Sequence, residues 1–527
     1  MITLLHCGPH SPQRLVNAFA AIDVPVQLAT SADDIRTAEQ LVLSSEAPFD
    51  ATIRQLLCRN LLTALRDYLF DKRSFLGIGT GAHILFDTRE HAPAWTGLGV
   101  FPGTVRPLYA DRPTHPFMGW AGIRAQANSR LFHGLAGDEK FFFAHVDQAV
   151  PARDNLCLAQ TDTASPVPAV VGDDTRLGVQ FLPHKSGSAG LHILKNYADT
   201  ALAAPQSNPA HTSQSAATPA RSIVACLDMH ADTHGNLVVT KGDQYDVNVG
   251  GTVRNLGDPV EMACHYYDDG ADEIAFLHIA GYRDNPLRNT AVTDIISAAS
   301  RRIFVPLTIG GGIRDYTDDR GLPVSALEIA ARYFRAGADK ISIGSNAVDI
   351  AKRYLHTGRK TGGSAIETIS QCYGAHTVVV SVDPRRVYVN APSDVPHHVV
   401  PSDPPGPAGE AFCWYECMVK GGREGTGIDA ITLAQAVEAL GAGTILLNSI
   451  DKDGTNSGFD LALINAVREA VTIPVVASSG AGKVAHFSEV FAQTRAESAL
   501  AAGILHRREV SIRDIKQHLH GKVEVRK

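Results

Sequence analysis

Ser222-Ile-Val-Ala-Cys-Leu-Asp228 and Thr377-Val-Val-Val-Ser-Val-Asp383 are two short stretches of the same design, each an apolar run that ends in an aspartate. A continuous hydrophobic run of this length is typical of a strand that is buried on both faces, as in a parallel sheet. A carboxylate at the end of such a strand would stand at the rim where barrel enzymes carry their reactive groups. The alternative is that each stretch is a core strand that ends in a turn-forming Asp. The segments that follow favour the first interpretation.

Two further pairs of segments repeat along the chain. Val305–Gly312 and Ile473–Gly482 each run from a strand into a glycine cluster, and Ala271–His278 and Ala442–Asn448 are matching strands that each lead into a turn with an aspartate. Two halves that each contain an Asp-tipped strand, a second strand and a Gly-rich loop predict a (β/α)8 barrel with internal duplication. A Pro- and Gly-rich insertion near residues 385–425 accounts for its unusual length.

The chain has 527 residues and is 44% hydrophobic, which allows two or three domains with real cores. Residues 1–202 alternate short strands and helices and predict a compact α/β domain. Residues 203–220 contain three prolines and no large apolar side chain, which predicts a linker, and residues 221–527 form the predicted barrel. In the first domain we expect strands at Ile2–His6, Val26–Ala29, Leu41–Ser44, Phe75–Gly79, Lys140–His145 and Leu177–Phe181, and helices near Pro12–Ala21 and Thr52–Phe70.

Composition narrows the classes of function. The net charge is −7 with both signs interspersed, which argues against a nucleic-acid or membrane surface. The first residues predict a strand instead of a signal peptide, so we expect a cytoplasmic protein. The cysteines are scattered, and Cys413 and Cys417 lack a second pair for a zinc site, so we expect reduced thiols and no metal. We also expect a monomer.

The glycine-rich loops have a physical use beyond turning. Without Cβ atoms, the backbone N–H groups of Gly310-Gly-Gly312 and Ser478-Ser-Gly480 can close around a phosphate. Gly344-Ser345 and Ala502-Gly503 supply a second such loop in each half. Two loop pairs predict a phosphate on each side of the barrel mouth, and therefore a long substrate that is phosphorylated at both ends. The alternative is that these loops only turn tightly.

These motifs resemble a known family. Ala225-Cys-Leu-Asp228, Val238-Val-Thr-Lys-Gly-Asp-Gln-Tyr-Asp246, Asp451-Lys-Asp-Gly-Thr and Ala477-Ser-Ser-Gly-Ala-Gly482 are similar to the cyclase barrel of imidazole glycerol phosphate synthase. The insertion around Phe412–Gly422 resembles the fused eukaryotic form, in which a glutaminase domain precedes the barrel. The first domain keeps the skeleton of a class I glutamine amidotransferase.

The resemblance implies a reaction and a set of residues. Ammonia joins a phosphoribulosyl-formimino aminoimidazole carboxamide nucleotide, giving imidazole glycerol phosphate for histidine and an aminoimidazole carboxamide ribotide, with no cofactor. By this resemblance, Asp228 occupies the position of the main general acid/base and Asp383 that of its partner. Lys241 occupies a position close to the substrate. Imine formation and ring closure need such a pair, because a proton is removed on one side and delivered on the other. The residues of the two phosphate sites are Gly312, Gly344 and Ser345 in the first half, and Asp453, Gly454, Ser478, Ser479, Gly480, Ala502 and Gly503 in the second.

The chain departs from this family in its first domain. The positions of the glutaminase cysteine, histidine and glutamate carry Gly79, Leu182 and His184. Glycine and leucine can neither form a thioester nor move a proton, so we predict that the glutaminase activity is lost. Thr80 and Cys58 are the nearest replacements, but Cys58 lies in a predicted helix, where a buried and inert thiol is expected.

The barrel floor also departs from the family, whose ring of four charges gates the passage of ammonia. Glu273 and Lys340 are kept, whereas Ser222 replaces the arginine and Thr444 the second glutamate. The ring stays neutral and becomes more open. At the rim, His278 stands where the family has Asp or Asn, which implies a change in substrate handling.

Three hypotheses follow. The first is a cyclase that uses free ammonia or a separate glutaminase acting in trans, with the first domain kept as a packing partner for the barrel. The second is a non-catalytic protein that binds a phosphorylated ligand. The third is the sibling sugar-isomerising barrel of the same pathway, which shares paired aspartates and phosphate loops.

Overall fold

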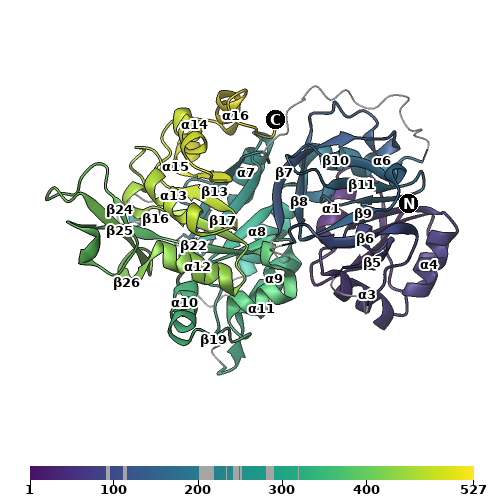
Figure 1. Cartoon of the computed structure of the whole chain (residues 1–527), viewed down its shortest axis with the longest axis horizontal. Helices are drawn as coiled ribbons and strands as arrows, with labels where there is room; N and C mark the ends of the chain where they lie inside the picture. The colour runs from purple at the N-terminus through teal and green to yellow at the C-terminus, as the bar shows by residue number, and fades with distance from the viewer. Residues whose placement is uncertain are drawn as a thin grey trace. The chain divides into compact units, whose positions relative to one another are not determined.

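The computed structural model describes residues 1–90, 95–110, 116–200, 219–232, 234–240, 248–249, 252–253, 255–279, 290–318 and 320–527. The chain divides into two compact units (Figure 1). One consists of Met1–Ala220 with Ser300–Val305 and Arg526–Lys527, and the other of Arg221–Ala299 and Pro306–Val525. Lys241 and most of the predicted linker lie outside the described residues.

The first unit is a mixed α/β domain built on a large sheet. In its described part, nine strands run in the order β2 (Val26–Leu28), β1 (Ile2–Cys7), β3 (Gln40–Ser45), β4 (Ser74–Gly79), β12 (Arg176–Val179), β11 (Pro168–Gly172), β10 (Cys157–Thr161), β7 (Phe117–Ala125) and β8 (Lys140–His145). The pairings from β2 to β12 are parallel and the others antiparallel. A smaller sheet contains β5 (Phe86–Arg89), β6 (Phe101–Pro107) and β9 (Asp147–Pro151). All six strands predicted for this domain are present.

The helices of this unit are α1 (Gln13–Ala20), α2 (Ala32–Thr37), α3 (Phe49–Cys58), α4 (Leu62–Phe70), α5 (Thr80–His83) and α6 (Gly187–Ala198). The prediction of one helix over Thr52–Phe70 was wrong. The chain breaks at Asn60, whose φ of 55° is left-handed and whose N–H bonds the carbonyl of Leu57. Cys58 is therefore the last residue of α3, and it is exposed instead of buried.

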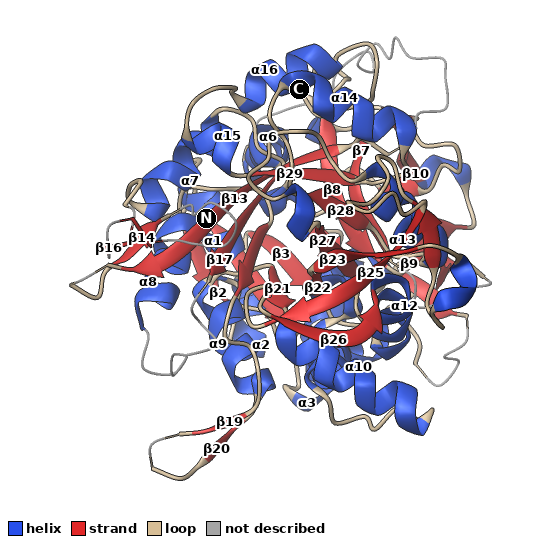
Figure 2. Ribbon diagram, turned by 90° about the vertical axis from the view of Figure 1, so that its left-hand side faces the viewer, coloured by secondary structure: helices blue, strands red, loops and turns tan. Residues whose placement is uncertain are grey.

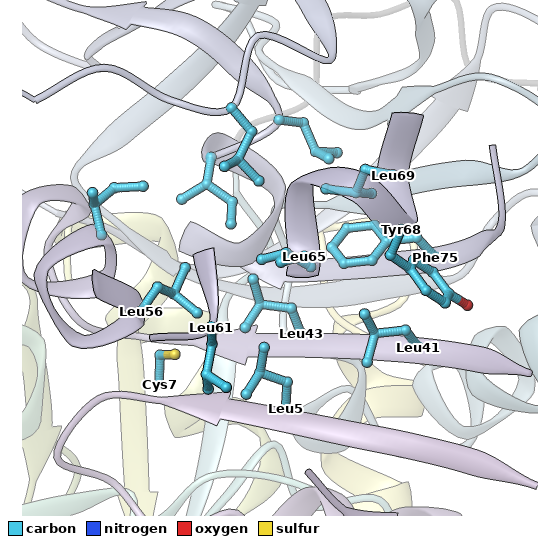
Figure 3. Close-up of a cluster of buried hydrophobic side chains, with 14 of the residues drawn as sticks. Leu5, Cys7, Leu41, Leu43, Leu56, Leu61, Leu65, Tyr68, Leu69 and Phe75 are labelled. Carbon is cyan, nitrogen blue, oxygen red and sulfur yellow. The ribbon is translucent and has the colours of Figure 1, made fainter. Parts of the chain in front are cut away.

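A hydrophobic core of this unit lies between helices α3 and α4 and the large sheet (Figure 3). Leu56 of α3 and Leu65 and Leu69 of α4 pack with Leu5 and Leu43 of the strands, and all five side chains are fully buried. Apolar burial on this scale is the main force that stabilises such a domain.

The second unit is a closed barrel (Figure 2). Among the described residues, eight parallel strands pair in sequence order, and the last returns to the first, because Ser222 to Ala225 pair with Ser498 to Ala501. The strands are β13 (Ser222–Ala231), β17 (Glu273–His278), β18 (Leu307–Gly310), β21 (Lys340–Ile343), β22 (Val378–Val382), β27 (Thr444–Asn448), β28 (Val475–Ser478) and β29 (Ser498–Ala501). The predicted (β/α)8 architecture is confirmed.

Helices follow the barrel strands and surround them in Figure 2. They include α7 (Pro259–Asp268), α8 (Thr290–Ser300), α9 (Ala326–Ala336), α10 (Ser345–Thr357), α11 (Ala365–Tyr373), α12 (Ala430–Leu440), α13 (Leu461–Ala470), α14 (Val484–Gln493), α15 (Gly503–His506) and α16 (Ile512–Leu519). Local sequence sets several ends. Ser325 and Glu328 form a capping box at the start of α9, and Asp429 caps α12. Both helices end at a left-handed glycine, Gly337 and Gly441.

The two halves of the barrel share a strand register. Val224 pairs with Glu273, and in the second half Val379 pairs with Thr444. One prediction needs correction, because Asp228 does not end its strand. Strand β13 continues to Ala231 and there pairs in antiparallel fashion with β14 (Leu237–Val239). Asp383, in contrast, directly follows the last residue of β22.

The insertion is an ordered antiparallel sheet. Strands β23 (Pro384–Val389), β24 (Val399–Pro401), β25 (Phe412–Val419) and β26 (Glu424–Asp429) pair around β25. The side chain of Arg386 forms an ion pair with the buried Asp460 at 2.8 Å, and Tyr415 donates to the same carboxylate at 2.9 Å. These contacts tie the insertion to the loop after β27. The backbone N–H of Met418 also bonds the carbonyl of Asp383 at 2.9 Å.

Candidate functional site

A cavity of about 280 Å³ opens at the carboxyl ends of the barrel strands. Asp228 and Asp383 both line it, although they lie on strands from different halves of the barrel. The duplication therefore brings the two carboxylates to one space, as expected for groups at the carboxyl ends of barrel strands.

Two side-chain hydrogen bonds hold one oxygen of the Asp383 carboxylate. Its Oδ1 accepts from the hydroxyl of Ser381 at 2.9 Å and from Nδ2 of Asn448 at 2.7 Å. The same Nδ2 also donates to Oγ of Ser381 at 3.0 Å. Burial raises the pKa of Asp383, the two donors oppose that shift, and the nearby charge of Asp453 adds to it.

Asp228 has a different environment. The thiol of Cys226 lies 3.7 Å from its Oδ1, and its backbone carbonyl accepts from the N–H of Thr240 at 2.7 Å. A thiol is a weak donor, so this contact constrains the carboxylate less than a hydroxyl and an amide do. The two aspartates thus match in register and differ in their partners.

The predicted phosphate loops contribute a large part of the remaining wall. The cavity is lined by Gly312, Gly344, Ser345, Asp453, Ser478, Ser479 and Ala502. Gly454, Gly480 and Gly503 are described but do not line it. Lys241 cannot be placed, because it lies outside the described residues.

Two of the loop glycines are required by close backbone approach. A Cβ on Gly311 would meet the carbonyl of His278 at 2.4 Å, and one on Gly480 would meet the carbonyl of Gly458 at 2.2 Å. Both glycines also have left-handed φ angles, of 110° and 93°. Ser479 adopts a left-handed φ of 74° although it has a side chain. The loops are therefore shaped by packing against neighbouring turns.

Sequence reasoning missed several residues of the wall, among them Arg314, Asn346, Ser381 and Asn448. Ser381 could have been found, because it lies two positions before Asp383 and strand residues two apart share a face. Asn448 required the pairing of β22 with β27. His278, noted at the rim, also lines the cavity and is buried.

The comparisons with known proteins agree with this geometry. A family model described as histidine biosynthesis protein matches residues 222–511. The imidazole glycerol phosphate synthase hisHF of Arabidopsis thaliana, named as chloroplastic, is 44% identical over all of this chain and 89% of its own length. The enzyme of the same name from Schizosaccharomyces pombe is 41% identical over 98% of each chain. The chain belongs to the imidazole glycerol phosphate synthase family. It is therefore a member of a family of histidine-biosynthesis enzymes with a glutamine amidotransferase-like domain fused to a barrel.

A relative that consists of the barrel subunit alone gives the same assignment for the second unit. The imidazole glycerol phosphate synthase subunit HisF of Methanocaldococcus jannaschii is 39% identical over 56% of this chain and 94% of its own length. Among the described residues, no helix has the length and apolar character needed to cross a membrane.

The four floor positions lie at the amino ends of barrel strands. Lys340 pairs with Glu273 at 2.6 Å, and Thr308 donates to the other oxygen of Glu273 at 2.5 Å. Ser222 begins β13, and Thr444 begins β27. In the described part of the barrel, the buried hydroxyl of Thr444 has no hydrogen-bond partner.

The three positions that are predicted to replace the glutaminase triad lie in the first unit. Gly79 has φ 61° and ψ −123° at the turn from β4 into α5, and a Cβ there would meet the carbonyl of Ser45 at 2.6 Å. Leu182 and His184 are both buried. Thr80 donates its hydroxyl to the carbonyl of Ala47 at 2.7 Å, which engages this candidate replacement in a backbone contact.

A buried ion pair lies next to these positions, and sequence reasoning missed it. Glu46 bonds Lys185 at 2.8 Å and lies 3.6 Å from Nε2 of His184. Burial acts to raise the pKa of Glu46, but Lys185, His10 and His184 hold it well below its usual value. Burial lowers the pKa of His184, which favours its neutral form.

Proposed function

We propose that the barrel converts the phosphoribulosyl-formimino nucleotide and ammonia into imidazole glycerol phosphate and the aminoimidazole carboxamide ribotide. The shared cavity of Asp228 and Asp383 is the observation that carries this proposal. Asp228 is the main general acid/base and Asp383 its partner. The raised pKa of Asp383 brings this carboxyl closer to the pH at which a group can both take and return a proton.

The loops that line the cavity support a substrate with a phosphate at each end. Gly312, Gly344 and Ser345 belong to one half of the barrel, and Ser478, Ser479 and Ala502 to the other. Gly344 also precedes α10, a helix of 13 residues whose N-terminus favours an anion. Lys241 is proposed to lie near the substrate on the basis of the family motif alone.

We also propose that the first domain has lost its glutaminase activity. Gly79 offers no nucleophile and Leu182 no base, and Glu46, beside His184, is already engaged by Lys185. Ammonia then comes from solution or from a separate glutaminase. The more open floor, with Ser222 and Thr444 in place of charged residues, is consistent with entry of free ammonia.

A paired assay tests this function. Purified protein is given the nucleotide with either ammonium chloride or glutamine, and imidazole glycerol phosphate is measured. We expect product with ammonium and none with glutamine, and a loss of roughly 100-fold or more in Asp228→Asn and Asp383→Asn, as for the removal of a general acid or base. Glutamine-driven turnover would contradict the loss of the glutaminase.

The same variants separate the alternatives. A phosphate-binding protein without catalysis would give no product in the wild type and would still bind the nucleotide in Asp228→Asn. A sugar-isomerising barrel would act on the aldose form of the pathway nucleotide without any ammonia. We further propose that the protein acts as a monomer in the cytoplasm, although the Arabidopsis relative is named as chloroplastic.

A further inference from the structure

Asp383, Ser381 and Asn448 form a triangle of hydrogen bonds, and each of the three bonds has one donor and one acceptor. Asn448 has two N–H groups and uses them on Oδ1 of Asp383 and Oγ of Ser381, at 2.7 and 3.0 Å. The Ser381 hydroxyl is then free to donate its own proton to Oδ1, at 2.9 Å. No side chain in the described parts of the chain donates a hydrogen bond to Oδ2 of Asp383.

The three residues are held by paired strands. Ser381 lies within β22, Asp383 directly follows it, and Asn448 ends β27. The pairing of these strands reaches Val382 with Leu447, so the next residues on each strand are Asp383 and Asn448. Groups carried by strands are positioned more accurately than groups on loops.

The first half of the barrel lacks this arrangement. Its strands pair Asp228 with the apolar Leu277, at the register where the second half has Asn448. Cys226 takes the place of Ser381, with its sulfur 3.7 Å from Oδ1 of Asp228. The Asn448 and Ser381 donors that hold Asp383 therefore have no counterpart at the matching positions of the first half, which carry Leu277 and Cys226.

We propose that Asn448 and Ser381 are positioning residues that hold Asp383 through Oδ1 and leave Oδ2 to exchange a proton with the substrate. This inference rests on the proposed function. Among the described residues, the titratable groups that act electrostatically on Asp383 are Asp453, from the loop after β27, and Cys417 of β25, while Asp228 and His278 line the same cavity. Neither Asp453 nor Cys417 donates to Oδ1, so the orientation of the carboxylate depends on the two positioning residues.

The test compares the pH profile of ammonia-dependent turnover in wild type, Asp383→Asn, Asn448→Leu and Ser381→Ala. Asp383→Asn identifies the limb of the profile that belongs to Asp383. Because donors to a carboxylate favour its charged form, their loss should move this limb to higher pH, by roughly one unit in Asn448→Leu and less in Ser381→Ala. We expect kcat to fall about tenfold in Asn448→Leu, from the loss of a charge-assisted hydrogen bond, with a smaller change in KM.

Asn465→Leu is the matched control. Asn465 lies on α13, where its Nδ2 donates to the backbone carbonyl of Gln493 at 3.1 Å, so the same substitution is made away from the cavity. The limb should stay in place in this variant. Thermal unfolding verifies that each variant folds. If Asn448→Leu does not fold, the pH profile of Ser381→Ala provides the test.

The outcomes separate the inference from the proposed function. If the wild type makes no product with ammonium, the proposed function is wrong and the inference falls with it. If the wild type is active but the Asp383 limb stays in place in the folded variants, the inference alone is overturned. A fall in kcat would not rescue the inference, because a purely structural defect lowers the rate without moving the pKa.

Discussion

Gly79 lies at the sharp turn from β4 into α5, at the position where we predict that the glutaminase nucleophile has been lost. Its φ of 61° and ψ of −123° suit a residue without a Cβ, and the space where a Cβ would stand is closed by the carbonyl of Ser45. The surroundings of Gly79 therefore suit a glycine, and we expect that a cysteine at this position alone would not create a working glutaminase.

Gly79→Cys should therefore be inactive as a glutaminase and less stable than wild type. We expect a loss of about 2 kcal/mol in the free energy of unfolding, from the strained φ and the contact with Ser45. Glutamate release from glutamine and the midpoint of thermal unfolding provide the measurements. Gly363→Cys is a control, because a Cβ at Gly363 would meet no atom within 4 Å. Glutamate release by Gly79→Cys would show that the rest of the site is intact.

Glu46 illustrates how one buried charge links stability to pH. Its folded pKa lies well below the usual value, so its contribution is complete above the unfolded pKa and disappears as the pH falls through the folded pKa. Glu46→Gln leaves Lys185 buried without its anion. We expect a loss of about 3 kcal/mol at neutral pH, as for one partner of a buried ion pair.

This difference from wild type should shrink as the pH falls below about 4, where the unfolded glutamate also becomes protonated. Urea denaturation at several pH values measures it. Glu39→Gln is the control, since the Glu39 side chain is 81% exposed and its contact with the N-terminus is 3.5 Å long. A difference that stays constant with pH would mean that Glu46 acts through packing alone.

At the scale of elements, an ion pair joins the amino ends of two strands at the described barrel floor. Lys340 of β21 reaches Glu273 of β17 across β18, which itself contributes Thr308. Ser222 and Thr444 are uncharged, so the charged residues among the four predicted ring positions are the two members of this pair.

Lys340→Met should destabilise the barrel by about 3 kcal/mol, because it leaves Glu273 largely buried and unpaired. The double variant Lys340→Met/Glu273→Leu should recover most of this loss, since no buried charge remains. Thermal and urea unfolding test both. Lys420→Met is the matched control: its pair with Glu424 is also 2.6 Å long but exposed, and exposed pairs contribute little. A double variant as unstable as the single one would refute this explanation.

At the scale of the whole molecule, the distribution of exposed apolar side chains leads us to expect a monomer. Among the described residues, the exposed large apolar side chains are Leu28 on β2, Leu57 on α3, Phe70 on α4 and Leu355 on α10, together with Met1 and Leu322, which lie outside the helices and strands. Isolated apolar residues of this kind are normal on a monomer. We therefore expect light scattering after size exclusion to give the mass of one chain at every protein concentration. A mass that rises toward that of two chains would contradict this expectation.

The agreement between sequence and structure varies with the range of the contacts involved. Patterns within about ten residues predicted the barrel strands, the positions of Asp228 and Asp383 and the glycine-rich loops of the cavity wall, since hydrophobic runs and glycine clusters have local causes. The end of β13 could not be predicted, because its extension to Ala231 depends on pairing with β14. The break at Asn60 and the exposure of Cys58 were missed because a helical pattern continues through them.

The chain's own residues were thus enough to predict its class, its barrel and the two carboxylates that line the cavity, whereas the loss of the glutaminase stays a prediction. Three features depended on long-range contacts: the shared cavity of Asp228 and Asp383, the hydrogen bonds of Asn448 to Asp383, and the buried pair of Glu46 and Lys185. The physical reason is that periodicity and turn chemistry are local, whereas a hydrogen bond or ion pair between residues 65 or 139 positions apart exists only once the strands that carry them have packed.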